Sequence, residues 1–147
     1  MFSLVFPGQG SQTIGMGKDF FENYNLVKDL FKEADDSLGT SLSKIILEGP
    51  KDELDLTVNT QPAIFLISYS IFQVMKKEFN MDLENAKYFA GHSLGEYSAL
   101  CAAKYLSFSD TIKILKTRGN AMQNAVPKGE GGMLAVLGSK VKIIEDL

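Results

Sequence analysis

Residues 91–95, Gly-His-Ser-Leu-Gly, form the Gly-x-Ser-x-Gly pattern of a nucleophile elbow. The apolar run 87–90 before it predicts a short buried strand, and residues 97–103 predict the helix that follows. A serine in the sharp turn between them exposes its hydroxyl, while the flanking glycines let strand and helix approach closely. The N–H of Leu94 should point, with the helix N-terminus, toward an oxyanion formed on an acyl group. We therefore expect Ser93 to be a catalytic nucleophile.

The chain has a single histidine, His92, although a serine nucleophile normally needs a histidine as its base. Because His92 is adjacent to Ser93, its side chain should leave the turn in another direction, so we expect a packing or backbone-bonding role. No histidine follows Ser93, whereas proteins with this elbow usually supply their base later in the sequence. Residues 1–147 alone are therefore expected to be inactive. The single cysteine, Cys101, excludes disulfides and thiolate metal sites and is expected in the core.

Arg118 is the only arginine among fifteen basic residues, all the others being lysines. This choice suggests that the geometry of a guanidinium is needed at this position, since charge alone is supplied equally well by lysine. Two parallel charge-assisted bonds to a carboxylate suit arginine far better than lysine. We expect Arg118 to bind a carboxylate. A solvated basic residue on a helix face is the alternative if the residue is considered alone.

Strands and helices are expected to alternate along the chain, which predicts an α/β fold with a parallel sheet. The pattern predicts strands at 2–6, 87–90 and 132–138, and helices at 19–37, 42–47, 63–78, 97–103 and 111–125. The helix at 63–78 has a broad apolar face, which indicates burial on more than one side. Residues 59–62 are expected to cap it, and residues 107–110 to cap the helix at 111–125.

A second structural unit is expected after residue 126. Residues 127–131, Pro-Lys-Gly-Glu-Gly, are typical of a hinge-like loop, and the strand expected at 132–138 follows it. Residues 140–147 have helical spacing but end without a cap, glycine or polar tail. We therefore interpret the chain as part of a longer one.

The amino-acid composition narrows the classes of protein to which the chain can belong. The 147 residues are 45% hydrophobic with mixed charges, as in an ordinary soluble globular protein. Apolar runs such as 63–67 are too short to span a bilayer, and no basic segment precedes the first strand, so we expect a cytoplasmic protein without a membrane partner. A net charge of −3 and scattered lysines disfavour nucleic-acid binding on electrostatic grounds.

Several motifs in order identify a family. Together they resemble malonyl-CoA:acyl carrier protein transacylases, and they lie at 5–12, 59–63, 91–100, 118–123 and 132–135. The resemblance extends over the whole chain. Members of that family are about twice as long and pair a hydrolase-like α/β subdomain, which carries the nucleophile elbow on a parallel sheet, with a small ferredoxin-like subdomain. By this likeness, residues 1–126 are the first part of the large subdomain, and residues 127–147 are the hinge and the start of the small one.

The resemblance also implies the role of each site residue. Ser93 would take the malonyl group from malonyl-CoA as an ester and transfer it to the phosphopantetheine thiol of acyl carrier protein, in fatty acid biosynthesis. The N–H groups of Gln9 and Leu94 would form the oxyanion hole. Arg118 would bind the free malonyl carboxylate, and Gln61 and Met122 would line the pocket. No cofactor or metal is implied, because malonyl-CoA is a substrate, and the catalytic base would lie beyond residue 147.

Other interpretations stay open. A serine hydrolase or thioesterase shares the elbow but gives no reason for a lone arginine. A non-catalytic half-domain that needs a complementary chain, an acyltransferase domain of a polyketide synthase and a malonate decarboxylase subunit are further alternatives. Gln61 could be a helix cap, and Met122 could fill the core. A dinucleotide-binding loop is disfavoured, because Gly8 and Gly10 are followed by Thr13 where a third glycine is needed.

Overall fold

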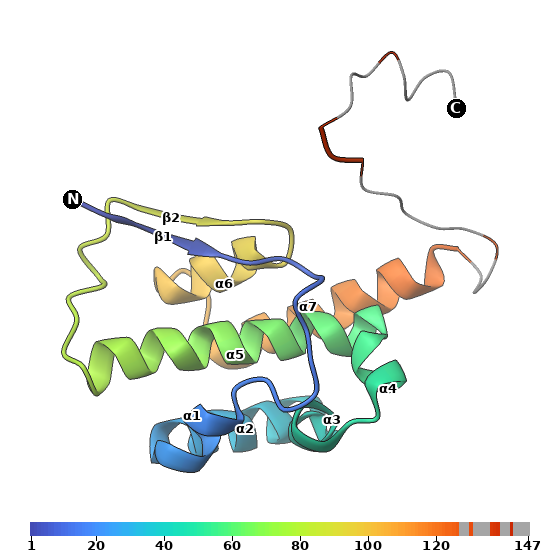
Figure 1. The fold of residues 1–147 in the computed structure, drawn as a ribbon, viewed down its shortest axis with the longest axis horizontal. Coiled ribbons are helices and arrows are strands. Elements are labelled where there is room, and N and C mark those ends of the chain that lie inside the picture. The colour runs from blue at the N-terminus through green and yellow to red at the C-terminus, as the bar shows by residue number, and fades with distance from the viewer. Residues whose placement is uncertain (127–129, 131–135, 139–141, 143–147) are drawn as a thin grey trace.

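The computed structural model describes residues 1–126, 130, 136–138 and 142 (Figure 1). The fold is mixed α/β with a small parallel sheet. Its elements, in chain order, are β1 (Ser3–Phe6), α1 (Lys18–Asn23), α2 (Asn25–Leu38), α3 (Leu42–Glu48), α4 (Lys51–Asp55), α5 (Thr57–Lys77), β2 (Tyr88–Gly91), α6 (Gly95–Ala102) and α7 (Phe108–Asn124).

The sheet confirms the predicted parallel pairing. Within the described residues it has two strands, β1 and β2, with Ser3 opposite Tyr88 and Phe6 opposite Gly91. Because parallel strands end at the same edge of a sheet, the loop after β1 and the turn after β2 lie next to each other. Two segments separated by more than eighty residues of sequence are thereby placed at one edge.

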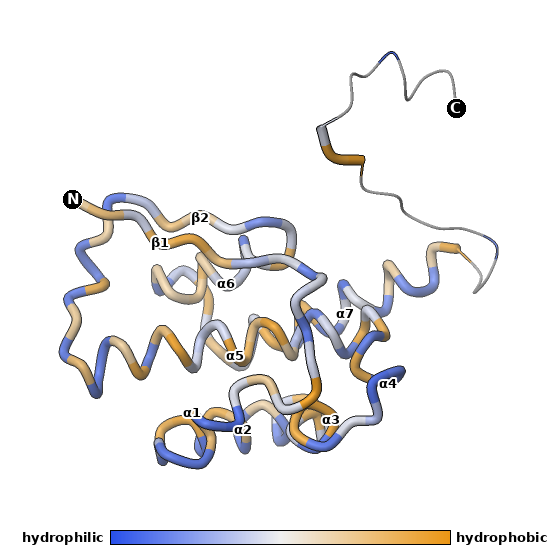
Figure 2. The backbone as a smooth tube through the Cα atoms, in the orientation of Figure 1, coloured by the Kyte–Doolittle hydropathy of each residue, from blue (hydrophilic) through white to orange (hydrophobic). Residues whose placement is uncertain are grey.

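Helix α5 lies at the centre of the molecule, between two hydrophobic clusters (Figure 1). On one side it packs against α2 and α7, where Phe31, Phe65 and Leu115 are almost fully buried. On the other side Phe72 packs with Phe6 of β1 and with residues of α6. Figure 2 shows hydrophobic residues recurring along α2 and α5, with hydrophilic residues between them. Burial of α5 on more than one side is thus confirmed.

The single helix predicted at 19–37 is wrong, because two helices cover this segment. Tyr24, which joins α1 to α2, has φ −124° and ψ 116°, an extended conformation that no helix allows. Aromatic contacts stabilise the bend, since the rings of Phe20 and Tyr24 lie 6.0 Å apart, and those of Phe21 and Phe31 5.0 Å apart. These contacts depend on the tertiary fold, so the apolar spacing along the segment did not reveal the break.

The prediction that residues 59–62 cap a helix is also wrong, because they lie inside α5. Pro62 cannot donate to the carbonyl one turn earlier, which normally disfavours a proline within a helix. Polar side chains stabilise this end of the helix: Thr60 Oγ1 donates to the carbonyls of Leu54 (2.6 Å) and Leu56 (3.1 Å), and Asn59 Nδ2 donates to that of Glu53 (2.8 Å). Packing and these bonds together override the local signal.

Most of the remaining predictions agree with the structure where it describes the chain. The strands at 2–6 and 87–90, the helix at 42–47 and the helix after Ser93 are confirmed within a few residues. The burial expected of the strand at 87–90 is wrong, because Tyr88 is 59% exposed and, within the described residues, β2 pairs with β1 alone. Ser107 caps α7 by accepting a bond from the Asp110 N–H (3.1 Å), although α7 begins three residues earlier than predicted. Of the strand predicted at 132–138, residues 132–135 lie outside the described residues, and residues 136–138 form no strand. The helix predicted at 140–147 lies outside the described residues apart from Lys142.

Cys101 is buried on α6, with 3% of its surface exposed, as predicted for a core residue. Burial raises the pKa of its thiol, because the thiolate would be formed away from water. We expect Cys101 to resist alkylation by iodoacetamide at neutral pH until the protein is unfolded. Peptide mass mapping with and without denaturant measures this, and rapid labelling of the native protein would contradict it.

Candidate functional site

Ser93 lies at the tip of a strained turn between β2 and α6. Its φ is +56°, in the left-handed region that a residue with a side chain rarely adopts, and its side chain is exposed. The N–H groups of Gly95 and Glu96 close the turn by donating to the carbonyls of His92 (2.9 Å) and Ser93 (3.2 Å). Leu94, whose side chain is fully buried, stands at the N-cap of α6. The predicted elbow geometry is therefore present.

The glycines of the elbow permit contacts that no other residue would allow. A Cβ atom on Gly91 would lie 1.9 Å from the carbonyl carbon of Gly95 and 2.0 Å from its oxygen. On Gly95 it would lie 2.4 Å from the carbonyl oxygen of Phe6. Strand β2, helix α6 and the end of β1 thus meet backbone to backbone at the serine turn.

Gly91→Ala is therefore expected to destabilise the protein, because backbone atoms must move to admit the methyl group. An overpacked position of this kind typically costs about 1–3 kcal/mol. Ala90→Ser, a change at the neighbouring exposed position of β2, serves as the control and should leave the denaturation midpoint nearly unchanged. Urea unfolding of the two variants measures the difference, and equal midpoints would show that the close approach is not needed.

The loop after β1 lies against the elbow, as the parallel sheet requires. A Cβ on Gly8 would lie 2.5 Å from His92 Nδ1, and the His92 N–H donates to the Phe6 carbonyl (3.1 Å). The structural role expected of His92 agrees with these contacts. Gln9 follows Gly8 in this loop and is exposed.

Further bonds hold this loop from its other end. Gln12 Oε1 accepts from the Gly10 N–H (2.9 Å), and Gln12 Nε2 donates to Asp55 Oδ1 at the end of α4 (3.0 Å). A bond from Lys51 to the same carboxyl group lowers the pKa of Asp55, which keeps it an acceptor. The Gln12 side chain thus links Gly10, which follows Gln9, to the end of α4.

Arg118 of α7 reaches across to the serine. Its Nη2 donates to Ser93 Oγ at 3.1 Å, and its Nη1 donates to Gln61 Oε1 of α5 at 2.6 Å. Gln61 is 1% exposed, and its Nε2 donates to Met122 Sδ at 3.2 Å. The structure therefore brings together four of the predicted site residues, Ser93, Arg118, Gln61 and Met122. The lone arginine lies beside the predicted nucleophile.

Tyr97 belongs to the same group, although no sequence motif indicated a role for it. The Arg118 guanidinium carbon lies 5.9 Å from the centroid of the Tyr97 ring, within the range of a cation–π contact. Tyr97 is four residues after Ser93 and so lies one turn along α6 from the elbow. The four-residue spacing from Ser93 was the only sequence feature that pointed to Tyr97. It did not indicate which residue of α7 would lie over the Tyr97 ring.

Close packing of α7 on the first turns of α5 fixes the distance between Arg118 and Gln61. A Cβ on Gly119 would lie 2.7 Å from the carbonyl oxygen of Thr57, so the two helices touch through backbone atoms there. Lys116 Nζ donates to Asn59 Oδ1 (2.9 Å), and its partial burial lowers the pKa of Lys116. These contacts flank Arg118 on both sides along α7.

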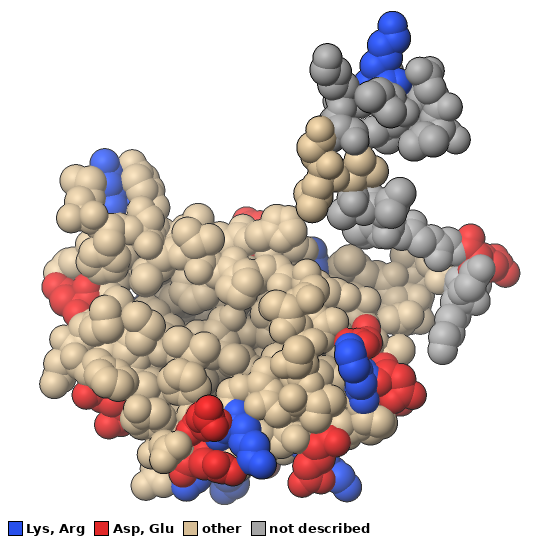
Figure 3. All heavy atoms as spheres, viewed as in Figure 1, with Lys and Arg blue, Asp and Glu red and all other residues tan. Residues whose placement is uncertain are grey.

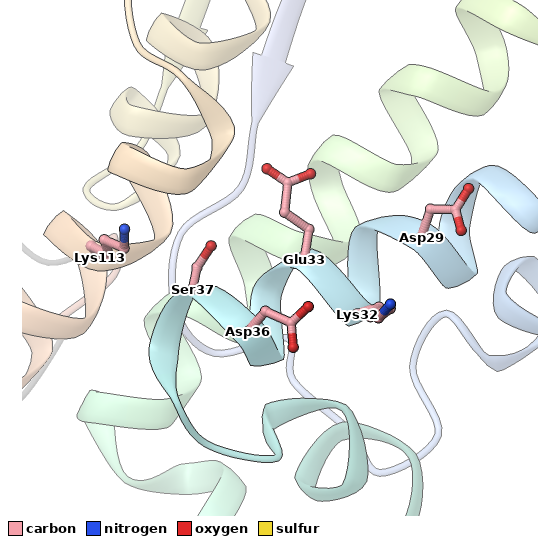
Figure 4. Close-up of a pocket in the computed structure, with 6 residues that line it drawn as sticks. All are labelled: Asp29, Lys32, Glu33, Asp36, Ser37 and Lys113. Carbon is pink, nitrogen blue, oxygen red and sulfur yellow. The ribbon is translucent and has the colours of Figure 1, made fainter.

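A charged hollow of about 440 Å³ lies elsewhere, between α2 and α7 (Figure 4). Its lining residues are Asp29, Lys32, Glu33, Asp36, Ser37 and Lys113. Ser37 Oγ is within hydrogen-bond distance of Ser109 Oγ, 3.2 Å away, across the seam between the two helices. Figure 3 shows charged side chains of both signs gathered along the edge that α1 to α4 form. We interpret this hollow as a solvated seam, separate from the serine.

Residues 3–146 match the acyl transferase domain family. The chain belongs to this family. It is 46% identical over 145 residues to the malonyl CoA-acyl carrier protein transacylase of Bacillus subtilis (strain 168), which covers 99% of this chain and 44% of that protein. The crystal structure of an acyl-carrier-protein S-malonyltransferase from Bartonella henselae superposes with a TM-score of 0.90 and 49% identity, over 99% of this chain and 47% of that one.

A third relative is a malonyl transacylase solved in complex with its type II PKS acyl-carrier protein, with a TM-score of 0.79 and 41% identity over 87% of this chain and 40% of that one. The acyl transferase chain thus spans less than half the length of these relatives. They confirm the resemblance that the sequence motifs indicated. In the part of the chain that the structure describes, no helix is long and apolar enough to cross a membrane, and no cluster of three metal-ligating side chains forms.

Proposed function

We propose that the whole protein transfers a malonyl group from malonyl-CoA to the phosphopantetheine thiol of an acyl carrier protein, in fatty acid biosynthesis. The observation that carries this proposal is the 3.1 Å bond between Arg118 Nη2 and Ser93 Oγ. It places the only arginine of the chain in direct contact with the predicted nucleophile, close enough to bind the far end of a short acyl group. A guanidinium in that position suits an acyl group that ends in a carboxylate.

In the first half-reaction, Ser93 Oγ forms a bond to the thioester carbonyl carbon and gives up its proton. The carbonyl oxygen becomes an oxyanion, which the N–H groups of Leu94 and Gln9 stabilise. Collapse of the intermediate breaks the C–S bond, and coenzyme A leaves with a proton. The carrier-protein thiol then reverses these steps on the malonyl ester, and Ser93 regains its proton.

Arg118 acts during both steps by holding the free carboxylate of the malonyl group. Gln61 and Met122, which are in contact with each other, would line the site that receives the malonyl group. The proton from Ser93 needs a base, and we place that base in the part of the whole protein outside residues 1–147, because the only histidine here is held against the Gly8 loop. Residues 1–147 alone are therefore expected to transfer malonyl very slowly.

We further propose that residues 1–126 are the first part of a hydrolase-like subdomain. Residues 127–147 would be the hinge and the start of a ferredoxin-like subdomain. The two-stranded parallel sheet that leads into a strained serine turn supports the first assignment. The relatives, which are more than twice as long, support a longer chain that completes the same site.

The experiment that tests this function asks where the acyl group goes. The whole protein is incubated with labelled malonyl-CoA in the presence and absence of phosphopantetheinylated acyl carrier protein. We expect label on the carrier protein and little free malonate. Rapid release of malonate whether or not carrier protein is present would instead show a thioesterase, and no turnover with either acceptor would show a binding module.

A further inference from the structure

A chain of hydrogen bonds runs from Met122 through Gln61 to Arg118 and ends at Ser93. The three links measure 3.2 Å from Gln61 Nε2 to Met122 Sδ, 2.6 Å from Arg118 Nη1 to Gln61 Oε1, and 3.1 Å from Arg118 Nη2 to Ser93 Oγ. Arg118 and Met122 lie one turn apart on α7. Gln61 of α5 is therefore held between two residues of the same neighbouring helix.

The orientation of the Gln61 amide decides whether Arg118 has an acceptor. One end of the amide is a carbonyl oxygen and the other carries two N–H donors. Rotation by half a turn would place these donors against the guanidinium, which itself has only donors. Since Gln61 is 1% exposed, water is poorly placed to repair that mismatch.

Met122 supplies the feature that selects one orientation. A thioether sulfur accepts hydrogen bonds weakly and donates none, so it favours the amide with its N–H groups toward the sulfur. That orientation turns Oε1 toward Arg118. We propose that Met122 is a positioning residue that, through the Gln61 amide, aims the Arg118 guanidinium at the acyl site. This proposal rests on the proposed function and assigns Met122 a role beyond lining the pocket.

The consequence concerns selectivity. Arg118 contacts the carboxylate that distinguishes a malonyl from an acetyl group, whereas the serine chemistry is common to both. Disturbing the Gln61 amide should therefore impair malonyl transfer and spare acetyl transfer. A side chain that simply packed the core, or touched both acyl groups, would affect the two substrates together.

The first test is Met122→Leu, which keeps a similar volume but removes the acceptor. In the whole protein we expect kcat/KM for malonyl-CoA to fall roughly 3- to 10-fold, the usual effect of one lost hydrogen bond, with acetyl-CoA nearly unaffected. Met81→Leu is the matched control, because Met81 is 44% exposed and Met122 42%, and Met81 lies between α5 and β2. The control variant should have the wild-type kcat/KM for both malonyl-CoA and acetyl-CoA.

The second test repeats the change in a Gln61→Glu background. A carboxylate accepts through both oxygens, so its rotation no longer matters to Arg118. Within that background, Met122→Leu should cause no further loss of malonyl transfer. The proposal is overturned if Met122→Leu still lowers malonyl transfer in the Gln61→Glu background. It is also overturned if Met122→Leu alone lowers kcat/KM equally for malonyl-CoA and acetyl-CoA, or changes kcat/KM for neither. Wild-type protein that transfers no malonyl at all would instead refute the proposed function.

Discussion

Replacing Ser93 with alanine is expected to abolish acyl-enzyme formation by the whole protein. The strained turn, with φ +56° at residue 93, exposes this hydroxyl immediately before Leu94, the N-cap of α6. Without the oxygen no ester can form, and the loss of a serine nucleophile typically lowers kcat by roughly 10⁴- to 10⁶-fold. Intact mass spectrometry after incubation with malonyl-CoA measures the ester directly.

Ser109→Ala is the matched control for this experiment. It removes one hydroxyl from α7, in the seam with α2, without touching the elbow. The control protein should gain the mass of one malonyl group, and peptide mapping should place that group on Ser93. Label on another residue, or equal labelling of the Ser93→Ala protein, would refute Ser93 as the nucleophile.

The elbow was predictable because its signals are local. Two glycines around a serine, a preceding apolar run and a following helix pattern all lie within residues 87–103, and each reflects a requirement of the backbone in the turn. The positive φ of Ser93 and the close approach at Gly91 bear out that geometry. The catalytic role of Ser93 stays a prediction that labelling must test.

Features that depend on contacts between distant segments were predicted less well. The bend at Tyr24 is stabilised by aromatic packing, and Thr60 is drawn into α5 by bonds to the carbonyls before the helix. Neither the bend nor the early start of α5 can be predicted from the spacing of apolar residues in its own segment. Tyr97 was missed for the same reason, since only the fold brings α7 over its ring. Arg118 was found because a lone arginine among lysines is itself a compositional signal.

Arg118→Ala is expected to change the selectivity of the whole protein more than its chemistry. On the proposed role of Arg118, the variant loses two charge-assisted bonds to the substrate carboxylate, each contributing roughly 1.5–3 kcal/mol. The preference for malonyl-CoA over acetyl-CoA in kcat/KM should therefore fall by roughly 10²- to 10⁴-fold. Arg118→Lys should restore only part of it, because an ammonium group lacks the planar fork.

Acetyl-CoA provides the internal comparison, since its acyl group offers Arg118 no carboxylate. In the free protein Arg118 Nη2 already donates to Ser93 Oγ, so an acetyl group must displace that bond without replacing it. Its kcat/KM should thus change little or rise in the Arg118→Ala variant. Lys113→Ala, the control, removes an exposed charge from the same helix and should leave kcat/KM unchanged for both substrates. If Arg118→Ala lowers both substrates equally, Arg118 supports the elbow structurally and does not select a dicarboxylic acyl group.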